Sequence, residues 1–540
     1  MKKTIHTLRT HFPELASALL LGGVYLFALL FWHYRLPYML DSDMASEMVL
    51  ARLLCDENKL ITQSWFYSTE VRVLNTQAIY ALFFHFTDNW SLVRFLSNAV
   101  LYGILAGSTM YLCRRLGLSR SYALTVGCFP LLALCYDDVI IMLMGCYYIP
   151  HIAIMFLTLG LVFAYPDAGK KRRYLLLGAG ALLAFLAGLG GIRQMVICYA
   201  PLMMVLVILG VMHLCCKGFA DYRTSVLFRR TVMALCSTVC CGVGVLLNMF
   251  VLTRRYHCYN WGGVRLASFD RERFLQVLAD LPVTFGFVRS GHGLHAFVRD
   301  ALAVVLILLL FWGIFSGLRK GAASRHRFMS AFFLCDLAVY LALYMVTNMS
   351  YTARYNLPVL ICAVPLIALG VQALGDLKGR QSLRTVLPLV MTGAFLFRGG
   401  LMAYDMRDHQ RNAGILEIAA HLRESDYHVG FATFWNANVL TELTDGSAEM
   451  YHWGATKADG SGFEQIESPE TLFSWLQKTS HIDAPPEGKV FAVYRNNEIP
   501  YCNWRNGLRE VDVLWQEGDY TVYGYESYAQ MMSLLGGKVS

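Results

Sequence analysis

Long apolar stretches, separated by short polar connections, fill residues 1–402 of the chain. A helix needs about 20 mainly apolar residues to cross the hydrocarbon core of a bilayer. The shorter stretch 75–86 is too polar to cross and is predicted to be re-entrant or interfacial. Eleven stretches approach or reach the required length, and they predict eleven membrane-spanning helices at 14–34, 91–112, 121–136, 139–164, 174–190, 195–216, 231–252, 299–317, 329–347, 356–375 and 385–402.

The pattern changes after residue 402, where charged residues and turn signals such as Asp445-Gly446 and Asp459-Gly460 become frequent. Short β-like runs are predicted at Val429–Phe434, Lys489–Tyr494 and Tyr520–Tyr525, with helices near 413–424 and 468–478. Such a mixture predicts a small α/β domain. The expected fold class is therefore an α-helical polytopic membrane domain over 1–402, followed by a soluble α/β domain over 403–540.

Composition agrees with a membrane protein, because 56% of the residues are hydrophobic and only 16% are charged. Ordinary soluble domains are about 45–50% apolar and about 25% charged. The 15 cysteines lie mostly inside apolar runs, where cysteine behaves as a small hydrophobic side chain. Cys258 and Cys502 are predicted to lie outside the membrane, and they are the pair that could form a disulfide.

Lysine and arginine gather in alternate connections between the predicted spans, as the positive-inside rule expects. The short connections on the opposite side hold almost none. The assignment places the N-terminus in the cytoplasm and the large segments 35–90, 253–298 and 403–540 on the extracytoplasmic face of a plasma or inner membrane. The cytoplasmic connections then hold Lys2, Lys3, Arg9, Arg114, Arg115, Arg120, Lys170, Lys171, Arg172, Arg173, Lys217, Arg223, Arg229, Arg230, Arg319, Lys320, Arg325, Arg327, Lys378, Arg380 and Arg384.

Three carboxylates gather in the first extracytoplasmic segment. Asp41 follows the first span, and Asp43 and Glu47 lie four positions apart, on one face of a helix. Apolar residues from Met44 to Leu53 recur at helical spacing and predict a helix that lies on the membrane surface. Because aspartate also favours helix N-termini as a cap and through the helix dipole, a purely structural interpretation of this cluster stays open.

Asp137-Asp138 forms a second acidic pair on the same side, in a short connection between two predicted spans. The pair is either a solvated loop tip or part of a binding site. Hard cations such as Mg²⁺ or Mn²⁺ prefer oxygen ligands. If this pair meets the carboxylates of the first segment, Asp43 and Asp138 are candidate metal ligands.

Two arginines stand on the face where positive charge is rare, Arg193 after a Gly-Gly-Ile sequence and Arg354 before Tyr355. A guanidinium binds phosphate with forked geometry, whereas the alternative is an arginine that extends to the lipid headgroups. His151, just inside the fourth span, is either structural or substrate-binding. Arginines and aromatic residues in 253–298 suit sugars or anionic headgroups, or a plain interfacial belt.

Several of these residues resemble motifs of the GT-C glycosyltransferases, multi-spanning enzymes that use a polyprenyl-phosphate-linked sugar. The lipid A aminoarabinose transferases and protein O-mannosyltransferases of that superfamily have an Asp after helix one and an interfacial helix with a Glu and an Ala-Arg. Asp41, Glu47 and Ala51-Arg52 fall in a similar arrangement, and Trp65 resembles the aromatic residue that closes the segment. The chain departs from the pattern in having Asp43 and in its Glu-to-Ala spacing.

Arg354-Tyr355, together with Pro358, resembles the Arg-Tyr motif that opens a late helix in these enzymes. The resemblance implies an inverting transferase that moves a sugar from a polyprenyl-phosphate donor to a lipid, glycan or protein acceptor. Asp41 or Asp43 would be the general base, and Arg354 or Arg193 would hold the leaving phosphate. Asp137 or Asp138 would position the acceptor or a metal.

Glu47, His151 and Tyr355 complete the expected substrate-binding set, and the tail after residue 402 would help recognise the acceptor. A transporter or flippase of a lipid-linked saccharide remains an alternative, although the sequence shows no internal repeat and no chain of buried charges. A non-catalytic protein of envelope assembly is a second alternative. Membrane lipids are expected contacts, and nucleic acid is not.

Overall fold

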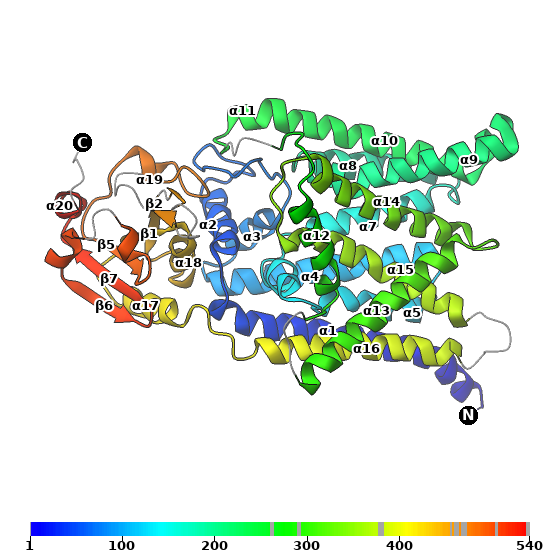
Figure 1. The fold of residues 1–540 in the computed structure, drawn as a ribbon, viewed down its shortest axis with the longest axis horizontal. Coiled ribbons are helices and arrows are strands. Elements are labelled where there is room, and N and C mark those ends of the chain that lie inside the picture. The colour runs from blue at the N-terminus through cyan, green and yellow to red at the C-terminus, as the bar shows by residue number, and fades with distance from the viewer. Residues whose placement is uncertain are drawn as a thin grey trace. The chain divides into compact units, whose positions relative to one another are not determined.

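Figure 1 shows the computed structural model of the chain, which divides into two compact units. The helical unit consists of 1–31, 98–248 and 262–407, and the mixed unit consists of 32–97, 249–261 and 408–540. The mixed unit thus combines the first predicted extracytoplasmic segment with the tail. The structure describes residues 2–259, 264–288, 293–375, 383–453, 456–457, 464–465, 472–502 and 506–535.

Helices long and apolar enough to cross a membrane confirm that the chain is a polytopic membrane protein. Within the described residues there are eight, or nine if the bent pair Arg120–Leu131 and Tyr136–Met144 forms one span. The predicted count of eleven is therefore not confirmed. The eight are Phe12–Tyr38, Trp90–Leu116, Met195–Thr224, Val226–Arg255, Leu294–Leu318, Ser324–Val346, Ala353–Gly375 and Val386–Met406.

Three of the predicted spans account for the difference in number. The predicted spans 121–136 and 139–164 are interrupted, because the chain bends by 98° before Tyr136 and a turn precedes α7 (Ile149–Ala164). α7 itself has only 16 residues. α8 (Lys170–Gly188) begins with four basic residues, so its apolar part starts only at Tyr174.

Small residues allow close packing inside the helical unit. A Cβ atom added to Gly188 of α8 would lie 2.1 Å from the Cys241 carbonyl oxygen of α10, so only glycine permits this approach. Many side chains on the other helix faces are apolar and exposed, as expected where lipid covers them. The remaining helices are α1 (Lys2–Arg35), α4 (Trp90–Leu116), α5 (Arg120–Gly127), α6 (Tyr136–Asp138), α9 (Ala200–Thr224), α10 (Val226–Leu247), α12 (Arg271–Thr284), α13 (Leu294–Leu318), α14 (Ser324–Val346), α15 (Leu357–Gly375) and α16 (Leu383–Met406), with the shorter segments η2 (Phe129–Leu131), η3 (Val139–Met144), η4 (Met195–Tyr199) and η6 (Ala353–Asn356). The segment η5 (Asn248–Leu252) lies almost entirely in the mixed unit.

The mixed unit is built on a five-stranded sheet with the strand order β2-β1-β5-β7-β6. β1 runs parallel to both β2 and β5, whereas β7 runs antiparallel to β5 and β6. The sheet strands are β1 (Val429–Thr433), β2 (Glu449–Trp453), β5 (Val490–Arg495), β6 (Val513–Glu517) and β7 (Tyr520–Tyr525), and a separate pair is formed by β3 (Thr456–Lys457) and β4 (Glu464–Gln465). Its helices are α2 (Ser42–Asp56), α3 (Thr76–Phe84), α11 (Thr253–Arg255), α17 (Ala413–Arg423), α18 (Phe434–Leu443), α19 (Ser480–Asp483) and α20 (Tyr528–Leu534), with the turns η1 (Leu36–Tyr38), η7 (Ile499–Tyr501) and η8 (Gly507–Glu510).

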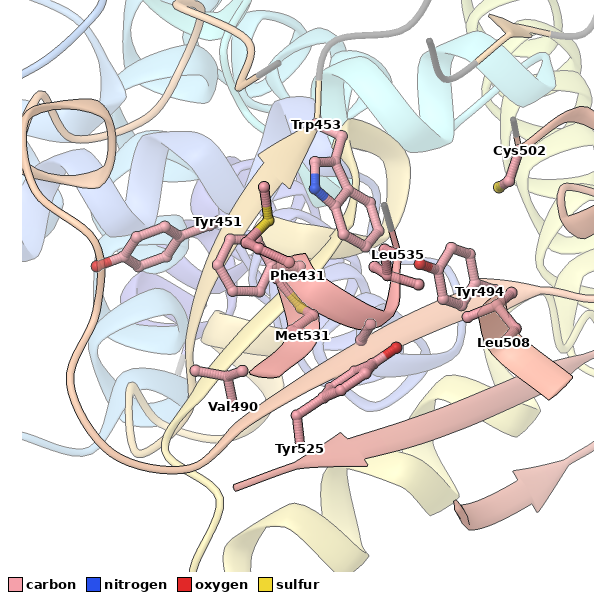
Figure 2. Packing of buried hydrophobic residues seen from close by; sticks show 12 residues of the cluster. Phe431, Tyr451, Trp453, Val490, Tyr494, Cys502, Leu508, Tyr525, Met531 and Leu535 are labelled. Atoms are coloured by element: carbon pink, nitrogen blue, oxygen red, sulfur yellow. The ribbon is translucent and has the colours of Figure 1, made fainter. Parts of the chain in front are cut away.

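Buried aromatic rings form the core on this sheet, as Figure 2 shows. Phe431 stacks on Trp453 at 5.7 Å between ring centroids, and Trp453 stacks on Tyr494 at 5.4 Å. Each of the three rings is fully buried. Met531 of α20 belongs to the same cluster and attaches the end of the described chain to the sheet.

The sequence located most of these elements. The three predicted strands correspond to β1, β5 and β7, and the helix predicted near 413–424 is α17, so the α/β character of the tail is confirmed. The helix predicted near 468–478 is wrong in its described part, because 472–478 is not helical and its backbone bonds to His452 and to Phe66. Asp445 and Gly446 form the predicted turn with positive φ, whereas Asp459-Gly460 and Lys378, Arg380, Trp261, Arg289 and His292 lie outside the described residues.

Candidate functional site

Asp41 forms the N-cap of α2, which confirms the predicted helix in the first segment. Its Oδ1 accepts a hydrogen bond of 2.9 Å from the Met44 amide, and its backbone is extended. This is the structural role that aspartate has at helix N-termini. α2 buries residues on more than one face, because it packs against both α3 and α18. Its place on the membrane surface stays a prediction.

Glu47 is held by the mixed unit's own side chains. Its Oε1 lies 3.0 Å from Arg72 Nη1, and its Oε2 accepts a hydrogen bond of 3.1 Å from Thr76 Oγ1 at the start of α3. Glu47 therefore ties α2 to the segment before α3. Arg52, one turn further along α2, pairs with Asp56 at 3.0 Å and with Asp88.

A buried ion pair that the sequence did not reveal lies beside α2. Arg94 donates from Nε to Glu442 Oε1 and from Nη2 to Glu442 Oε2, both at 2.6 Å. The same guanidinium donates to the Met44 carbonyl oxygen at 3.1 Å and to the Tyr80 hydroxyl at 3.3 Å. Burial raises the pKa of Glu442, while Arg94 opposes the rise. One arginine therefore joins α2, α3, α4 and α18.

Trp65 and the two candidate cysteines also lie in the mixed unit. The Trp65 indole is fully buried, and its backbone forms a bridge to Lys478. The possible Cys258–Cys502 disulfide is absent, because both thiols are free. Trp65 thus fixes the segment between α2 and α3 through its backbone and its ring.

The Asp137-Asp138 pair lies in the helical unit, at the bend between η2 and α6. Asp138 is buried, and its Oδ2 accepts a hydrogen bond of 3.0 Å from the Leu134 amide. Asp138 therefore closes the bend, and it is not the solvated loop tip of the structural interpretation. Asp137 is only partly buried.

The predicted arginine motif lies next to this acidic pair. α6 packs against η6, and the Arg354 side chain interacts electrostatically with the Asp137 carboxylate. Asp280 of α12, which the sequence did not single out, is a second carboxylate within electrostatic range of Asp137. The structure therefore brings Asp137, Asp280 and Arg354 together, and Arg354 and Tyr355 are half-buried.

Asn356 fixes the position of the Arg354-Tyr355 motif. It is fully buried, and its Nδ2 donates to Thr284 Oγ1 and to the Tyr351 hydroxyl, both at 3.1 Å. Its Oδ1 accepts a hydrogen bond from the Tyr340 hydroxyl. Because these partners come from α12, α14 and the connection after α14, the turn η6 is held on three sides.

Arg193 and His151 both lie beside the ring of Tyr148. The Arg193 guanidinium lies 5.2 Å from the centroid of the Tyr148 ring, and the His151 ring lies 6.2 Å from it. Gln194 also donates to the His151 carbonyl oxygen at 3.2 Å. Tyr148 and Tyr355 are both within electrostatic range of Tyr344, so the two predicted arginine positions flank one tyrosine-rich region.

Metal-ligand residue types do not cluster in the part of the chain that the structure describes. No group of three or more His, Cys, Asp and Glu side chains there could hold an ion. Asp43 belongs to the mixed unit and Asp138 to the helical unit, and Asp138 bonds to a backbone amide. A divalent cation therefore stays a prediction.

Comparisons with known proteins gave matches at the level of structure. No family model and no curated protein matches the chain. The crystal structure of ArnT from Cupriavidus metallidurans in the apo state aligns with a TM-score of 0.57 and 14% identity, covering 96% of this chain and 99% of that chain. The same protein bound to undecaprenyl phosphate aligns with a TM-score of 0.55 and 13% identity, covering 93% and 98%.

At such low identity this likeness establishes the fold alone. The chain has the GT-C fold of multi-pass membrane glycosyltransferases, with a small mixed sheet domain in its C-terminal part. The resemblance inferred from short motifs is therefore confirmed for the fold.

Proposed function

We propose that the protein is a membrane glycosyltransferase that moves a sugar from a polyprenyl-phosphate carrier to an acceptor, with inversion. The observation that carries this proposal is the proximity of Arg354 to Asp137 in the helical unit of a chain with the ArnT-like fold. That ArnT was crystallised with undecaprenyl phosphate supports a donor of this type. The N-terminus is cytoplasmic and the tail is extracytoplasmic in this proposal.

Arg354 and Arg193 hold the phosphate that leaves. Guanidinium groups bind phosphate oxygens through charge-assisted, forked hydrogen bonds, and they stabilise negative charge as it develops on the leaving group. Tyr355 and His151 line the same tyrosine-rich region. Asp137 is half-buried beside Arg354, and we assign it to the positioning of the acceptor or of the donor sugar.

Asp41 acts as the general base on the acceptor hydroxyl, with Asp43 as the second candidate. Asp41 accepts the Met44 amide through Oδ1, and a carboxylate has several acceptor positions on its two oxygens. Glu47 acts indirectly in this scheme, because its two oxygens anchor α2 to Arg72 and Thr76. The acceptor is a lipid, a glycan or a protein.

Substitutions of Asp41 distinguish its role as a helix cap from its role as a general base. Asparagine caps a helix as well as aspartate does but cannot accept a proton, so Asp41→Asn should keep stability and lose transfer by about 10²–10⁴-fold. Asp41→Ala should lose stability as well, and Asp43→Asn is the matched control.

The assay measures polyprenyl phosphate released from a panel of polyprenyl-phosphate sugars by the full-length protein in nanodiscs. Normal release by Asp41→Asn together with loss in Asp43→Asn would transfer the role to Asp43, and normal release by both would refute a base at this helix end. A donor that crosses the bilayer without release would instead indicate a flippase.

A further inference from the structure

A pocket in the mixed unit lies at the edge where two parallel strands of the sheet end. Its volume is about 310 Å³, near the lower end of the 300–1,000 Å³ typical of small-molecule sites. Trp435 and Asn436 follow the end of β1, Arg495 ends β5, and Tyr520 begins β7. Residues far apart in sequence therefore converge here because of the sheet topology.

The strand order makes this edge a topological switch point. The chain passes from β1 through α18 to β2 on one side of β1, and then returns to form β5 on the other side. In open α/β sheets, ligands bind in the crevice outside the carboxyl ends of the strands at such a point. The pocket occupies this position between β1 and β5.

The side chains of the pocket combine an open aromatic surface with accessible positive charge. Trp435 is 47% exposed, although it is a large apolar side chain in a short helix. The Arg495 side chain is 46% exposed, and the carboxylate near it, Asp519, lies 3.9 Å away and is itself exposed. Such an exposed pair holds the guanidinium only weakly. Arg411 supplies a second exposed guanidinium to the same pocket.

The polar groups at the base of the pocket are fixed in place. Glu498 accepts hydrogen bonds of 3.0 Å from Thr433 Oγ1 and from the Arg495 amide, so it shapes the turn after β5. The Tyr520 hydroxyl donates to Asn436 Oδ1 at 3.4 Å. Hydroxyl and amide groups at fixed positions provide the directional hydrogen bonds that a sugar requires.

A second cleft in the mixed unit has a different balance of charged groups. It has a volume of about 280 Å³ and is also rich in charge, but its two cationic side chains face four carboxylates. Arg52 pairs with Asp56 and Asp88, and Lys478 lies 2.5 Å from Glu449. The pocket with Trp435 has two exposed guanidinium groups against one carboxylate, that of Glu498, so it suits an anion better.

We infer that the pocket at the carboxyl ends of β1 and β5 binds a saccharide that carries an anionic group. The pyranose ring lies on the Trp435 indole, and Arg495 and Arg411 bind the carboxylate or phosphate. The inference does not rest on glycosyl transfer, because binding at this pocket requires no donor. It gives the sheet domain a role in recognising a glycan.

Calorimetric titration of the full-length protein in nanodiscs tests the inference. The probes are glucuronate, glucose 6-phosphate, glucose and inorganic phosphate. Binding of glucuronate or of glucose 6-phosphate is expected to be at least about tenfold tighter than that of glucose or of phosphate. The preferred anionic sugar tells whether the group is a carboxylate or a phosphate.

Variants locate the binding. Trp435→Ala and Arg495→Ala should each weaken the preferred probe by at least about tenfold, whereas Trp435→Phe should retain most of the affinity. Trp515→Ala and Arg509→Ala remove the same residue types from the same domain outside the pocket, and they should bind as the wild type does. Thermal unfolding of each variant verifies the fold. Equal binding by Trp435→Ala and the wild type, tight binding of phosphate alone, or no binding of any probe to the wild type would overturn the inference.

Discussion

The charged residues beside α2 in the mixed unit and the two predicted arginines of the helical unit have different surroundings. In the mixed unit, Arg94 is fully buried and bound by both oxygens of Glu442, and Glu47 is bound by Arg72 and Thr76. In the helical unit, Arg193 and Arg354 are half-buried at helix ends, beside tyrosine rings. The first group should matter for stability and the second for substrate. Substitutions in the two groups test this division.

Glu442→Ala should destabilise the protein most, by about 3–5 kcal/mol, because it leaves the buried Arg94 guanidinium without its counter-charge. The free energy of unfolding in detergent is the quantity to measure. The double variant Arg94→Met with Glu442→Leu should recover most of the loss, since an apolar pair replaces both charges. A Glu442→Ala protein as stable as the wild type would show that the pair is not structural.

Asn356→Ala should affect both stability and donor affinity. Three hydrogen bonds that hold η6 are lost, at a cost of about 1–3 kcal/mol, and Arg354 is then free to shift. The control is Asn248→Ala, which removes a buried hydrogen bond of 2.7 Å to the Leu189 carbonyl oxygen. Both variants should unfold more easily, but only Asn356→Ala should raise the KM for the donor. An unchanged KM would show that the position of η6 does not affect donor binding.

Acid should weaken the mixed unit through His452. Burial lowers the pKa of His452 to about 3, and its Nδ1 is buried without a hydrogen-bond partner among the described residues. The unfolded chain binds this proton below about pH 6.5, so stability present at neutral pH is lost as the pH falls, by about 2 kcal/mol at pH 5. Thermal unfolding at pH 7.5 and at pH 5 measures the loss of stability between these values. In His452→Gln this loss should be smaller by the amount attributed to His452. An unchanged pH dependence would exclude His452 as its source.

Glu47→Gln should have the smallest effect. The ion pair with Arg72 is partly exposed, and glutamine can keep the hydrogen bond to Thr76, so about 0.5–1 kcal/mol of stability is lost. Transfer activity should remain close to that of the wild type. A large loss of activity with little loss of stability would show that Glu47 contacts substrate.

Most of the correct predictions came from patterns among residues that lie close together in the sequence. Apolar runs predicted the polytopic class, short β-like runs predicted β1, β5 and β7, and the helical spacing after Asp41 predicted α2. Contacts between distant residues could not be predicted, since Arg94 and Glu442 are 348 positions apart. An arginine inside the apolar run 91–112, Arg94, was a signal of a buried charge, but no residue near it in the sequence indicated its partner. Asp280 was missed for the same reason.

Binding of undecaprenyl phosphate to the full-length protein tests the central claim most directly. Native mass spectrometry can compare the wild type with Arg354→Gln and with Arg325→Gln, whose arginine pairs with Asp167 at 2.7 Å. Loss of a charge-assisted hydrogen bond predicts that Arg354→Gln binds about 10–100-fold more weakly, while Arg325→Gln binds as the wild type does. Equal binding by all three proteins would contradict the assignment of the phosphate to the Arg354 region.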